Sequence, residues 1–360
     1  MKKRLFTPGP TPVPDSVRAA MARPMMHHRD PAFGEIFTRV RQRLGWVFGT
    51  QEIILLAGSG TLAMEASVVN FVNGGDVALY VNSGKFGARF GEILRAYGVR
   101  AVAIDVPLGE SVSVEAVAAA LAQHPEARAL YVQGCETSTG VSQPVAALAQ
   151  LCHSQDDCLC IVDGITQVAI EPLPMDAWGI DVLLGATQKS FMMSAGLSVV
   201  GVSPRAWRRA ETATLPRFYT DLARERRAAG EGHTAWTSAV SLVYGLDAAL
   251  ELMEAEGLDA LYARHRALAQ RCRAELVAMG CRPFARPPAQ GLTVVRPPEG
   301  IDAQRVIGML NREHGMRIGG GQDALAGKIL RVAHMGDVDG YDLTLILSAI
   351  QQTLAAIQGA

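Results

Sequence analysis

The sequence predicts an α/β fold in which a mostly parallel, doubly wound sheet is followed by a smaller α+β C-terminal domain. Through the first 200 residues, apolar runs of strand length alternate with helix-period segments, the pattern of parallel strands joined by crossover helices. Two long helical patterns come next, and short strand patterns then alternate with helices. The chain has 360 residues, 49% of them hydrophobic, which is enough to bury two cores.

The predicted elements follow one another in this order. Four prolines in the first 14 residues indicate an extended arm, and Asp30 before Pro31 indicates the start of a helix that runs to about residue 48. Strands are predicted at 52–57, 76–82, 100–106, 127–133, 159–163, 182–186 and 198–203, with helices near 61–72, 87–98, 113–123 and 144–153. Further on, helices are predicted at 241–258, 261–280, 302–313 and 340–356, and strands at 292–295 and 328–335.

This order divides the chain into an arm over residues 1–14, a large domain over 15–255 and a small domain over 256–360. Doubly wound sheets bind their ligands at the carboxyl ends of the strands. We therefore expect the functional residues of the large domain directly after its predicted strands.

Composition argues against several classes of function. The net charge is −1, from 34 Lys and Arg against 35 Asp and Glu, so no positive field attracts nucleic acid or anionic lipid. The N-terminus lacks the apolar stretch of a signal peptide, and no apolar run approaches the roughly 20 residues of a membrane span. The six cysteines are irregularly spaced, and Cys158 and Cys160 lie in a predicted buried strand. We expect a cytoplasmic enzyme with free thiols and no metal site.

A glycine-rich loop, AGSGTLAMEA, follows the first strand of the predicted sheet. Its Gly58-x-Gly60-x-x-Ala63 matches the dinucleotide fingerprint, but the second strand does not end on the acidic residue that would hold a ribose. The backbone N–H groups of Ser59, Gly60 and Thr61 would equally suit a single phosphate at a helix N-terminus. The loop by itself does not distinguish a dinucleotide site from a phosphate site or from a plain strand-to-helix turn.

A carboxylate and an ammonium group follow two later strands. Asp163 ends LCIVD, where an unpaired carboxylate is costly to bury, although it would also suit a cap of the next turn. Lys189 follows VLLGA, and it suits either a nucleophile for a carbonyl cofactor or a surface lysine with a buried stem. Together with the loop they provide partners for a phosphate, a pyridinium and an aldehyde. This set fits pyridoxal phosphate better than a nicotinamide dinucleotide.

With these motifs the chain resembles the class V aminotransferases, in particular the serine–pyruvate, alanine–glyoxylate and serine–glyoxylate aminotransferases. The resemblance covers nearly the whole chain and implies a fold-type I pyridoxal-phosphate transferase, active as a homodimer with a shared active site. Its motifs occur in a fixed order: TPGPTPVP, HHRDPAF, GSGTLAMEA, NSGKFGARF, ETSTGVSQP, VDGITQ, MDAWGIDVLLGATQKSF and GGGQDALAGKILRVAHMG.

The resemblance also implies roles for individual residues. Lys189 would form the Schiff base with pyridoxal 5′-phosphate and then act as general base and acid, and Asp163 would pair with the pyridine nitrogen. Arg331 would hold the substrate carboxylate, Ser138 would bond the ring oxygen of the cofactor, and Phe86 would stack on its ring. The other cofactor contacts would come from Ser59, Gly60, Thr61, Ile165, Gln188 and, across a subunit interface, Thr237.

The implied activity is transfer of the amino group of serine, alanine or aspartate to glyoxylate or pyruvate. Two positions depart from the family pattern: Thr234 stands where relatives carry tyrosine, and Ser-Ala-Gly at 194–196 replaces Pro-Pro-Gly. A cysteine desulfurase-like lyase is an alternative, disfavoured because Gln188 replaces a histidine before the lysine and no cysteine follows Cys281. A cofactor-binding subunit without turnover is the other alternative.

Overall fold

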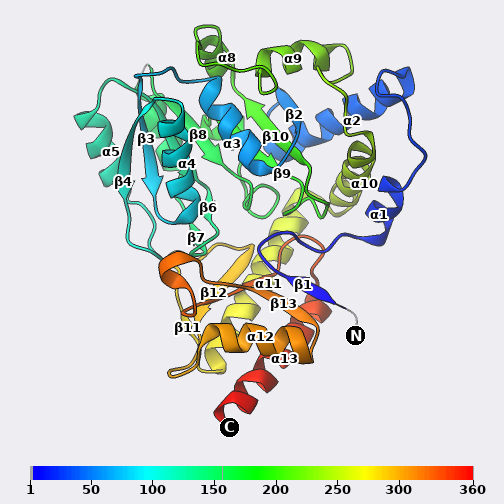
Figure 1. Cartoon of the computed structure of the whole chain (residues 1–360), viewed down its shortest axis with the longest axis vertical. Coiled ribbons are helices and arrows are strands. Elements are labelled where there is room, and N and C mark those ends of the chain that lie inside the picture. Colours follow the sequence, from blue (N-terminus) through cyan, green and yellow to red (C-terminus); the bar gives the residue numbers. More distant parts are fainter. Residues whose placement is uncertain (1–2, 156, 360) are drawn as a thin grey trace.

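A seven-stranded sheet forms the centre of the larger body, in the upper part of Figure 1. The computed structural model describes residues 3–155 and 157–359. Neighbouring strands run parallel except at β10, which is antiparallel to both β2 and β9, so the predicted α/β sheet is confirmed. In sheet order the strands are β2 (Ile53–Ala57), β10 (Leu197–Val202), β9 (Val182–Ala186), β8 (Leu159–Asp163), β5 (Ala127–Gln133), β3 (Val77–Asn82) and β4 (Arg100–Asp105).

Helices cover both faces of this sheet, which explains why its strands are almost continuously apolar. Alternate strand residues enter two clusters, as Leu55 and Leu79 do on one face and Leu56 and Tyr80 on the other. The first face carries α1 (Asp15–Met21), α2 (Pro31–Phe48), α5 (Val114–Gln123), α6 (Val145–His153), α7 (Met175–Trp178) and α10 (Val240–Glu256); the second carries α3 (Gly60–Val69), α4 (Lys85–Ala96) and α8 (Pro204–Ala210), and α9 (Leu222–Gly230) packs beside β2.

A second, five-stranded sheet lies in the lower body of Figure 1. Its edge strand β1 (Arg4–Phe6) pairs in parallel with β13, so the start of the N-terminal arm is a strand of the C-terminal sheet. The other pairs in this sheet are antiparallel. The remaining elements of this body are α11 (Leu258–Ala278), β11 (Arg282–Pro283), β12 (Leu292–Arg296), α12 (Ala303–Glu313), β13 (Met316–Gly320), η1 (Asp323–Leu325), β14 (Leu330–Ala333) and α13 (Gly340–Gln358).

The two bodies are joined through helices α10 and α11. Between them stands Gly257, whose φ of 82° is a conformation that glycine adopts at little cost. Helix α11 takes part in both cores, because Leu261 packs in the larger body and Leu268 in the smaller one. We propose this junction as the boundary between the large domain and the small domain.

Several short elements were absent from the sequence prediction: β1, α1, α7, α8, α9, β11, β13 and the two-stranded sheet of β6 (Cys135–Glu136) and β7 (Val141–Ser142). Most of them are too short to show a hydrophobic period. All six cysteines are free, as expected, and all six are buried, including Cys158 and Cys160, for which burial was predicted. Within residues 3–155 and 157–359, no helix is both long enough and apolar enough to cross a membrane.

Candidate active site

The loops at the carboxyl ends of β2, β8 and β9 meet at one edge of the large sheet. A Cβ atom at Gly60, the first residue of α3, would lie 2.6 Å from Cδ1 of Ile165 and 3.2 Å from Cβ of Ala186. Ile165 follows the last residue of β8 by two positions, and Ala186 ends β9. The glycine-rich loop therefore packs directly against the segments that carry Asp163 and Lys189.

Asp163 is the last residue of β8 and its side chain is buried. Its Oδ1 accepts a hydrogen bond from the backbone N–H of Ile165 at 2.9 Å, the turn-capping contact that the sequence left as an alternative. Burial raises the pKa of Asp163 to about 6, helped by the charge of Glu136 and opposed by the Ile165 hydrogen bond and the ammonium of Lys189. At neutral pH the carboxylate is therefore mostly ionised and ready to pair with a cation.

Lys189 lies three residues beyond β9 and is only partly exposed. Its Nζ donates a hydrogen bond to the carbonyl oxygen of Pro8, in the N-terminal arm. Burial, together with the charges of Arg331 and Arg89, lowers the pKa of Lys189 to about 8, while Asp163 opposes the shift. A neutral amine is thus available near physiological pH, which a surface lysine would not offer.

The start of α3 presents donors to an anion. Ser59 is the N-cap residue of this helix, but its side chain makes no capping hydrogen bond. The guanidinium of Arg89 lies nearby, because its Nη1 is 3.5 Å from Oγ1 of Thr61. Arg89 also lies over the ring of Phe86, with its Cζ 4.9 Å from the ring centroid. A helix N-terminus beside an arginine suits a phosphate group.

Arg89 was not among the predicted site residues, although it lies within the motif NSGKFGARF. It is one of the cations that influence both Asp163 and Lys189. Its distance of three positions from Phe86 was the available signal, because residues at that spacing share one helix face; the helix was predicted at 87–98, but α4 begins at Lys85 and so includes Phe86.

Glu136, the last residue of β6, and Ser138, in the turn between β6 and β7, form a buried pair. The Ser138 hydroxyl donates to Oε1 of Glu136 at 2.6 Å and accepts from the backbone N–H of Lys85 at 3.0 Å. Glu136 is fully buried. Its role was not predicted, although a glutamate beside the predicted cofactor ligand in ETSTG was a signal, because carboxylates are rarely buried without partners.

Arg331 is a residue of the small sheet whose side chain lies at the site. It lies on β14, where its Nε donates to the carbonyl of Gly320 at 2.8 Å and its Nη1 donates to the carbonyl of Thr137 at 3.0 Å. Burial lowers the pKa of the guanidinium, and the Glu136 carboxylate opposes that shift. Nη2 has no hydrogen-bond acceptor among the residues that the structure describes, so it is free to bind an anion.

Gln188 also lies at this edge, and its Oε1 is buried with no hydrogen-bond partner within the described part of the chain. Thr237, by contrast, is exposed and lines a groove with Met26 and His28. Thr237 also lines a small pocket with Leu197 and with Ala57, the last residue of β2. Within one subunit, the other predicted site residues thus gather at this edge, and Thr237 lies in the segment before α10, beside the end of β2.

Thr234 belongs to the same exposed segment as Thr237. Its hydroxyl donates to the carbonyl of Trp236 at 2.6 Å and contacts Oγ of Ser238 at 2.5 Å. Both contacts lie within four residues of Thr234, so they stabilise the local turn before α10.

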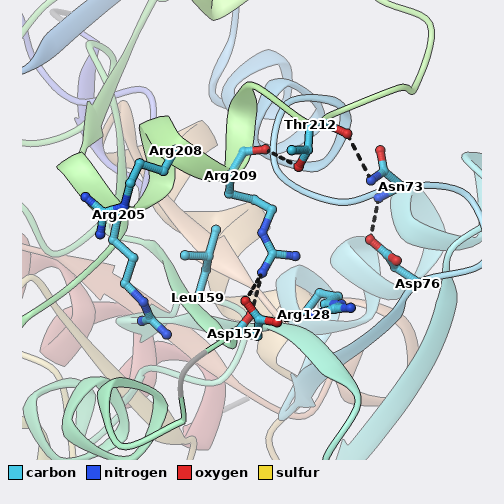
Figure 2. Close-up of a pocket in the computed structure, with 9 residues that line it drawn as sticks. All are labelled: Asn73, Asp76, Arg128, Asp157, Leu159, Arg205, Arg208, Arg209 and Thr212. Carbon is cyan, nitrogen blue, oxygen red and sulfur yellow. Dashed lines mark hydrogen bonds and ion pairs between the residues drawn. The ribbon is translucent and has the colours of Figure 1, made fainter.

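The cavity in Figure 2, of about 440 Å³, lies at the opposite end of the strands. Asp76 immediately precedes β3, and Leu159 is the first residue of β8. Among the described residues, three of the four arginines in this cavity form ion pairs: Arg205 with Asp181, and Arg128 and Arg209 with Asp157, the last at 3.0 Å. Surface pairs of this kind contribute little and need no ligand to explain them.

Comparison with known proteins agrees with this geometry. The family described as aminotransferase class-V matches residues 5–336. A protein named soluble hydrogenase, small subunit, from Synechococcus sp. is 37% identical over 99% of this chain and 94% of its own length. An L-aspartate–glyoxylate aminotransferase of Paracoccus denitrificans is 32% identical, over 96% of this chain and 89% of its own.

Among solved structures, the alanine–glyoxylate aminotransferase of Nostoc sp. superposes with a TM-score of 0.94. It is 32% identical, and the match covers 98% of this chain and 96% of that one. The family match covers residues 5–336, and the fold is shared with a solved aminotransferase of this family. Together with the site formed by Lys189, Asp163 and Arg331, these findings show that this chain belongs to the class V aminotransferase family.

Proposed function

We propose that this chain is a pyridoxal-phosphate-dependent aminotransferase that moves the amino group of a small amino acid to glyoxylate or pyruvate. The observation that carries the proposal is the half-buried amine of Lys189, which follows β9 at the edge where β8 ends on Asp163 and donates a hydrogen bond to the Pro8 carbonyl. Asp163 and Arg331 both act on the charge of its Nζ, and the pKa of the amine is lowered to about 8. A lysine of this kind serves as a carbonyl-binding nucleophile.

The residues present fit pyridoxal phosphate. The uncapped start of α3 and Arg89 suit its phosphate, the ionised Asp163 suits its pyridinium nitrogen, and Phe86 supplies an aromatic ring for stacking. The unpartnered Oε1 of Gln188 is an orphaned buried acceptor, which a bound group with a donor or a water would satisfy. Ile165 and Ser138 complete the predicted cofactor contacts.

When bound, pyridoxal phosphate supplies the aldehyde that condenses with an amine and the ring that withdraws electrons from the substrate Cα. The amine of Lys189 would be the group that binds this aldehyde, and it would also serve as the base and acid that moves the Cα proton of the substrate. Asp163 keeps the pyridine nitrogen protonated. Arg331 orients the substrate through its carboxylate, using the donors of a guanidinium already fixed by Gly320 and Thr137.

Borohydride trapping tests the Schiff base. Reduction of the wild-type protein with pyridoxal phosphate should leave the cofactor attached to the peptide that contains Lys189, as read by mass spectrometry. Lys189→Ala should abolish the attachment. Lys85→Ala is the matched control, because Lys85 lies near the site but its ammonium is paired with Asp323 at 3.0 Å. Trapping at a lysine other than Lys189 would refute the assignment.

The choice of substrate needs a panel of donors and acceptors. We propose serine, alanine or aspartate as donor, because relatives are named for aspartate– and alanine–glyoxylate transfer. Stopped-flow conversion of the aldehyde form of the cofactor to its amine form identifies the donors, and the reverse conversion with glyoxylate and pyruvate identifies the acceptor. Release of sulfide from cysteine, without amino transfer, would instead support a desulfurase.

We further propose a homodimer in which Thr237 completes the phosphate site of the neighbouring subunit. The exposure of Thr237, which leaves its side chain accessible to a second subunit, supports this assignment. Lys189→Ala and Thr237→Arg subunits, each inactive alone, should regain activity when mixed, because one of the two sites in a hybrid dimer then carries neither change. Mixed subunits that stay inactive, or a monomer in sedimentation, would contradict it.

The relative named as a hydrogenase subunit supports a second candidate, a cofactor-binding subunit without turnover. Trapped cofactor at Lys189 with no spectral response to any amino acid would favour it. Buried free cysteines are typical of reducing compartments, and on this ground we propose a cytoplasmic location.

A further inference from the structure

Glu136 is the last residue of β6, a strand that lies beside α4 (Figure 1), and its carboxylate accepts four hydrogen bonds. Its Oε2 accepts from the backbone N–H groups of Phe86 at 3.1 Å and Gly87 at 2.9 Å. Its Oε1 accepts from the backbone N–H of Ser138 at 3.1 Å and from the Ser138 hydroxyl at 2.6 Å. The carboxylate thus ties the residue predicted to stack on the cofactor to the residue predicted to bond its ring oxygen.

The four hydrogen bonds suit an ionised carboxylate. Each of them is donated to Glu136, and an ionised carboxylate can only accept hydrogen bonds. Burial raises the pKa of Glu136, and the hydrogen bonds from Ser138, Gly87 and Phe86 lower it. The backbone of Gly84 packs closely on this pair, since a Cβ atom there would lie 2.7 Å from Cδ of Glu136 and 2.5 Å from Oγ of Ser138. The acceptor geometry is therefore built into the fold.

The hydrogen-bonding capacity of the Ser138 hydroxyl follows from these contacts. A serine hydroxyl has one proton and two lone pairs. Its proton goes to Glu136, and one lone pair accepts from the backbone N–H of Lys85. One lone pair remains, so toward any further group Ser138 acts as an acceptor.

We propose that Glu136 is a positioning residue that makes Ser138 accept a hydrogen bond from the ring oxygen of the cofactor, and thereby favours the protonated form of that oxygen. The inference rests on the proposed function and deepens it. A serine with a free proton would do the opposite, because a donor stabilises an anionic ring oxygen. Glu136 itself touches neither cofactor nor substrate in this assignment.

The pH at which the absorption spectrum of the bound cofactor changes, here called the transition pH, reports this preference. Removing an acceptor from a protonated ring oxygen makes its proton easier to lose. Ser138→Ala should therefore lower the transition pH by roughly half a unit to one unit, the equivalent of a single hydrogen bond. A donor role for Ser138 predicts a rise of similar size, so the sign of the shift decides between them.

Glu136→Gln provides the second measurement. The amide oxygen of glutamine can still accept from Phe86 and Gly87, but its NH₂ group then donates to the Ser138 hydroxyl, which frees the serine proton for the cofactor, and the backbone N–H of Ser138 loses its acceptor. This variant should lower the transition pH by more than Ser138→Ala does. When Ser138→Ala is already present, Glu136→Gln should shift the transition pH by less than it does alone. Without the serine hydroxyl, the only remaining effect of Glu136→Gln on the ring oxygen is the loss of the carboxylate charge.

Asp181→Asn is a matched control for the loss of a buried carboxylate. Asp181 lies just before β9, at the opposite end of the strand, and accepts from Cys160 N–H at 2.9 Å and from Ser203 at 3.0 Å. This variant should leave the transition pH unchanged.

Two outcomes separate this inference from the function on which it rests. Wild-type protein that shows no absorption band with pyridoxal phosphate would overturn both. A normal wild-type band, with a transition pH that rises in Ser138→Ala or does not move in Glu136→Gln, would overturn the role of Glu136 alone. If Glu136→Gln does not fold, the sign of the shift in Ser138→Ala still decides the question.

Discussion

The Nζ atom of Lys189 donates a hydrogen bond to the carbonyl oxygen of Pro8, a residue 181 positions earlier in the chain. Pro8 follows β1, which pairs with β13 in the small sheet, whereas Lys189 follows β9 of the large sheet. Thr11 adds two contacts to the same loop, from its N–H to the Gln188 carbonyl at 3.1 Å and from its hydroxyl to the Lys189 carbonyl at 2.8 Å. The N-terminal arm therefore positions the lysine as well as linking the two bodies.

Gly9→Ala should reduce the rate at which the protein captures pyridoxal phosphate by about ten- to a hundredfold, because small displacements of a reacting group are costly. An added Cβ would lie 2.4 Å from Nζ of Lys189 and 2.6 Å from its Cε, so the side chain must move. The backbone φ of 134° adds strain of about 1 to 3 kcal/mol. Stopped-flow absorbance measures capture, and urea unfolding measures stability.

Gly75→Ala is the control for backbone strain alone. Gly75 has a φ of 85°, and a Cβ atom there would have no heavy-atom neighbour within 4 Å. It should lose stability without any change in cofactor capture. Equal capture rates for Gly9→Ala and wild type would show that the arm does not position Lys189.

Lys189→Met should stabilise the cofactor-free protein near pH 7, with a gain that shrinks as the pH rises. The folded-state pKa of Lys189 is lowered to about 8 from 10.5, so below pH 8 the folded protein buries an ammonium. Between these values the unfolded chain binds more protons, and the stability of the wild type rises with pH. The gain should fall by about 1 to 3 kcal/mol between pH 7 and pH 10.

Urea unfolding of both proteins at pH 7 and pH 10 gives the difference directly. Lys328→Met, at an exposed lysine, should show no such dependence on pH. A gain for Lys189→Met that is constant over this range would mean that the ammonium is not buried at a cost.

Gly60→Ala should weaken the binding of pyridoxal phosphate about tenfold, or ~1.4 kcal/mol. Its Cβ atom would displace Cδ1 of Ile165, which lies 2.6 Å away, and so shift the start of α3 against the loop after β8. Gly340→Ala is the matched control, because Gly340 is also the first residue of a helix, α13, and has open space around it. Fluorescence titration measures the affinity of each variant for pyridoxal phosphate. An affinity of Gly60→Ala equal to that of Gly340→Ala would mean that the phosphate binds away from the start of α3.

Arg331→Lys should raise KM for the amino donor and for the oxo acid at least about tenfold, with a smaller change in kcat. A lysine cannot donate to Gly320 and Thr137 while presenting a planar donor pair to a carboxylate. Arg317→Lys, at an exposed position of β13, should leave both constants unchanged. Unaltered KM values for Arg331→Lys would show that the substrate carboxylate binds another group.

The large sheet was predictable because its strands are long, apolar and buried on both faces, so β5, β8 and β9 end where the sequence predicted. The edge where the site forms followed from the parallel order of the strands. The direction of β10 did not, because hydrophobicity alone is the same for either direction. The resemblance supplied Ser138 and Arg331, which have no local pattern that indicates a site.

The sequence by itself thus determines most helices and strands, the family, and the types of functional group in the site, because hydrophobic periodicity and motifs are local properties of the chain. Contacts between distant segments depend on the folded chain. The hydrogen bond from Lys189 to Pro8, the position of β1 in the C-terminal sheet and the burial of Glu136 beneath α4 join segments that no local pattern connects. The lowered pKa of Lys189 has the same origin, because burial and neighbouring charges are properties of the folded site.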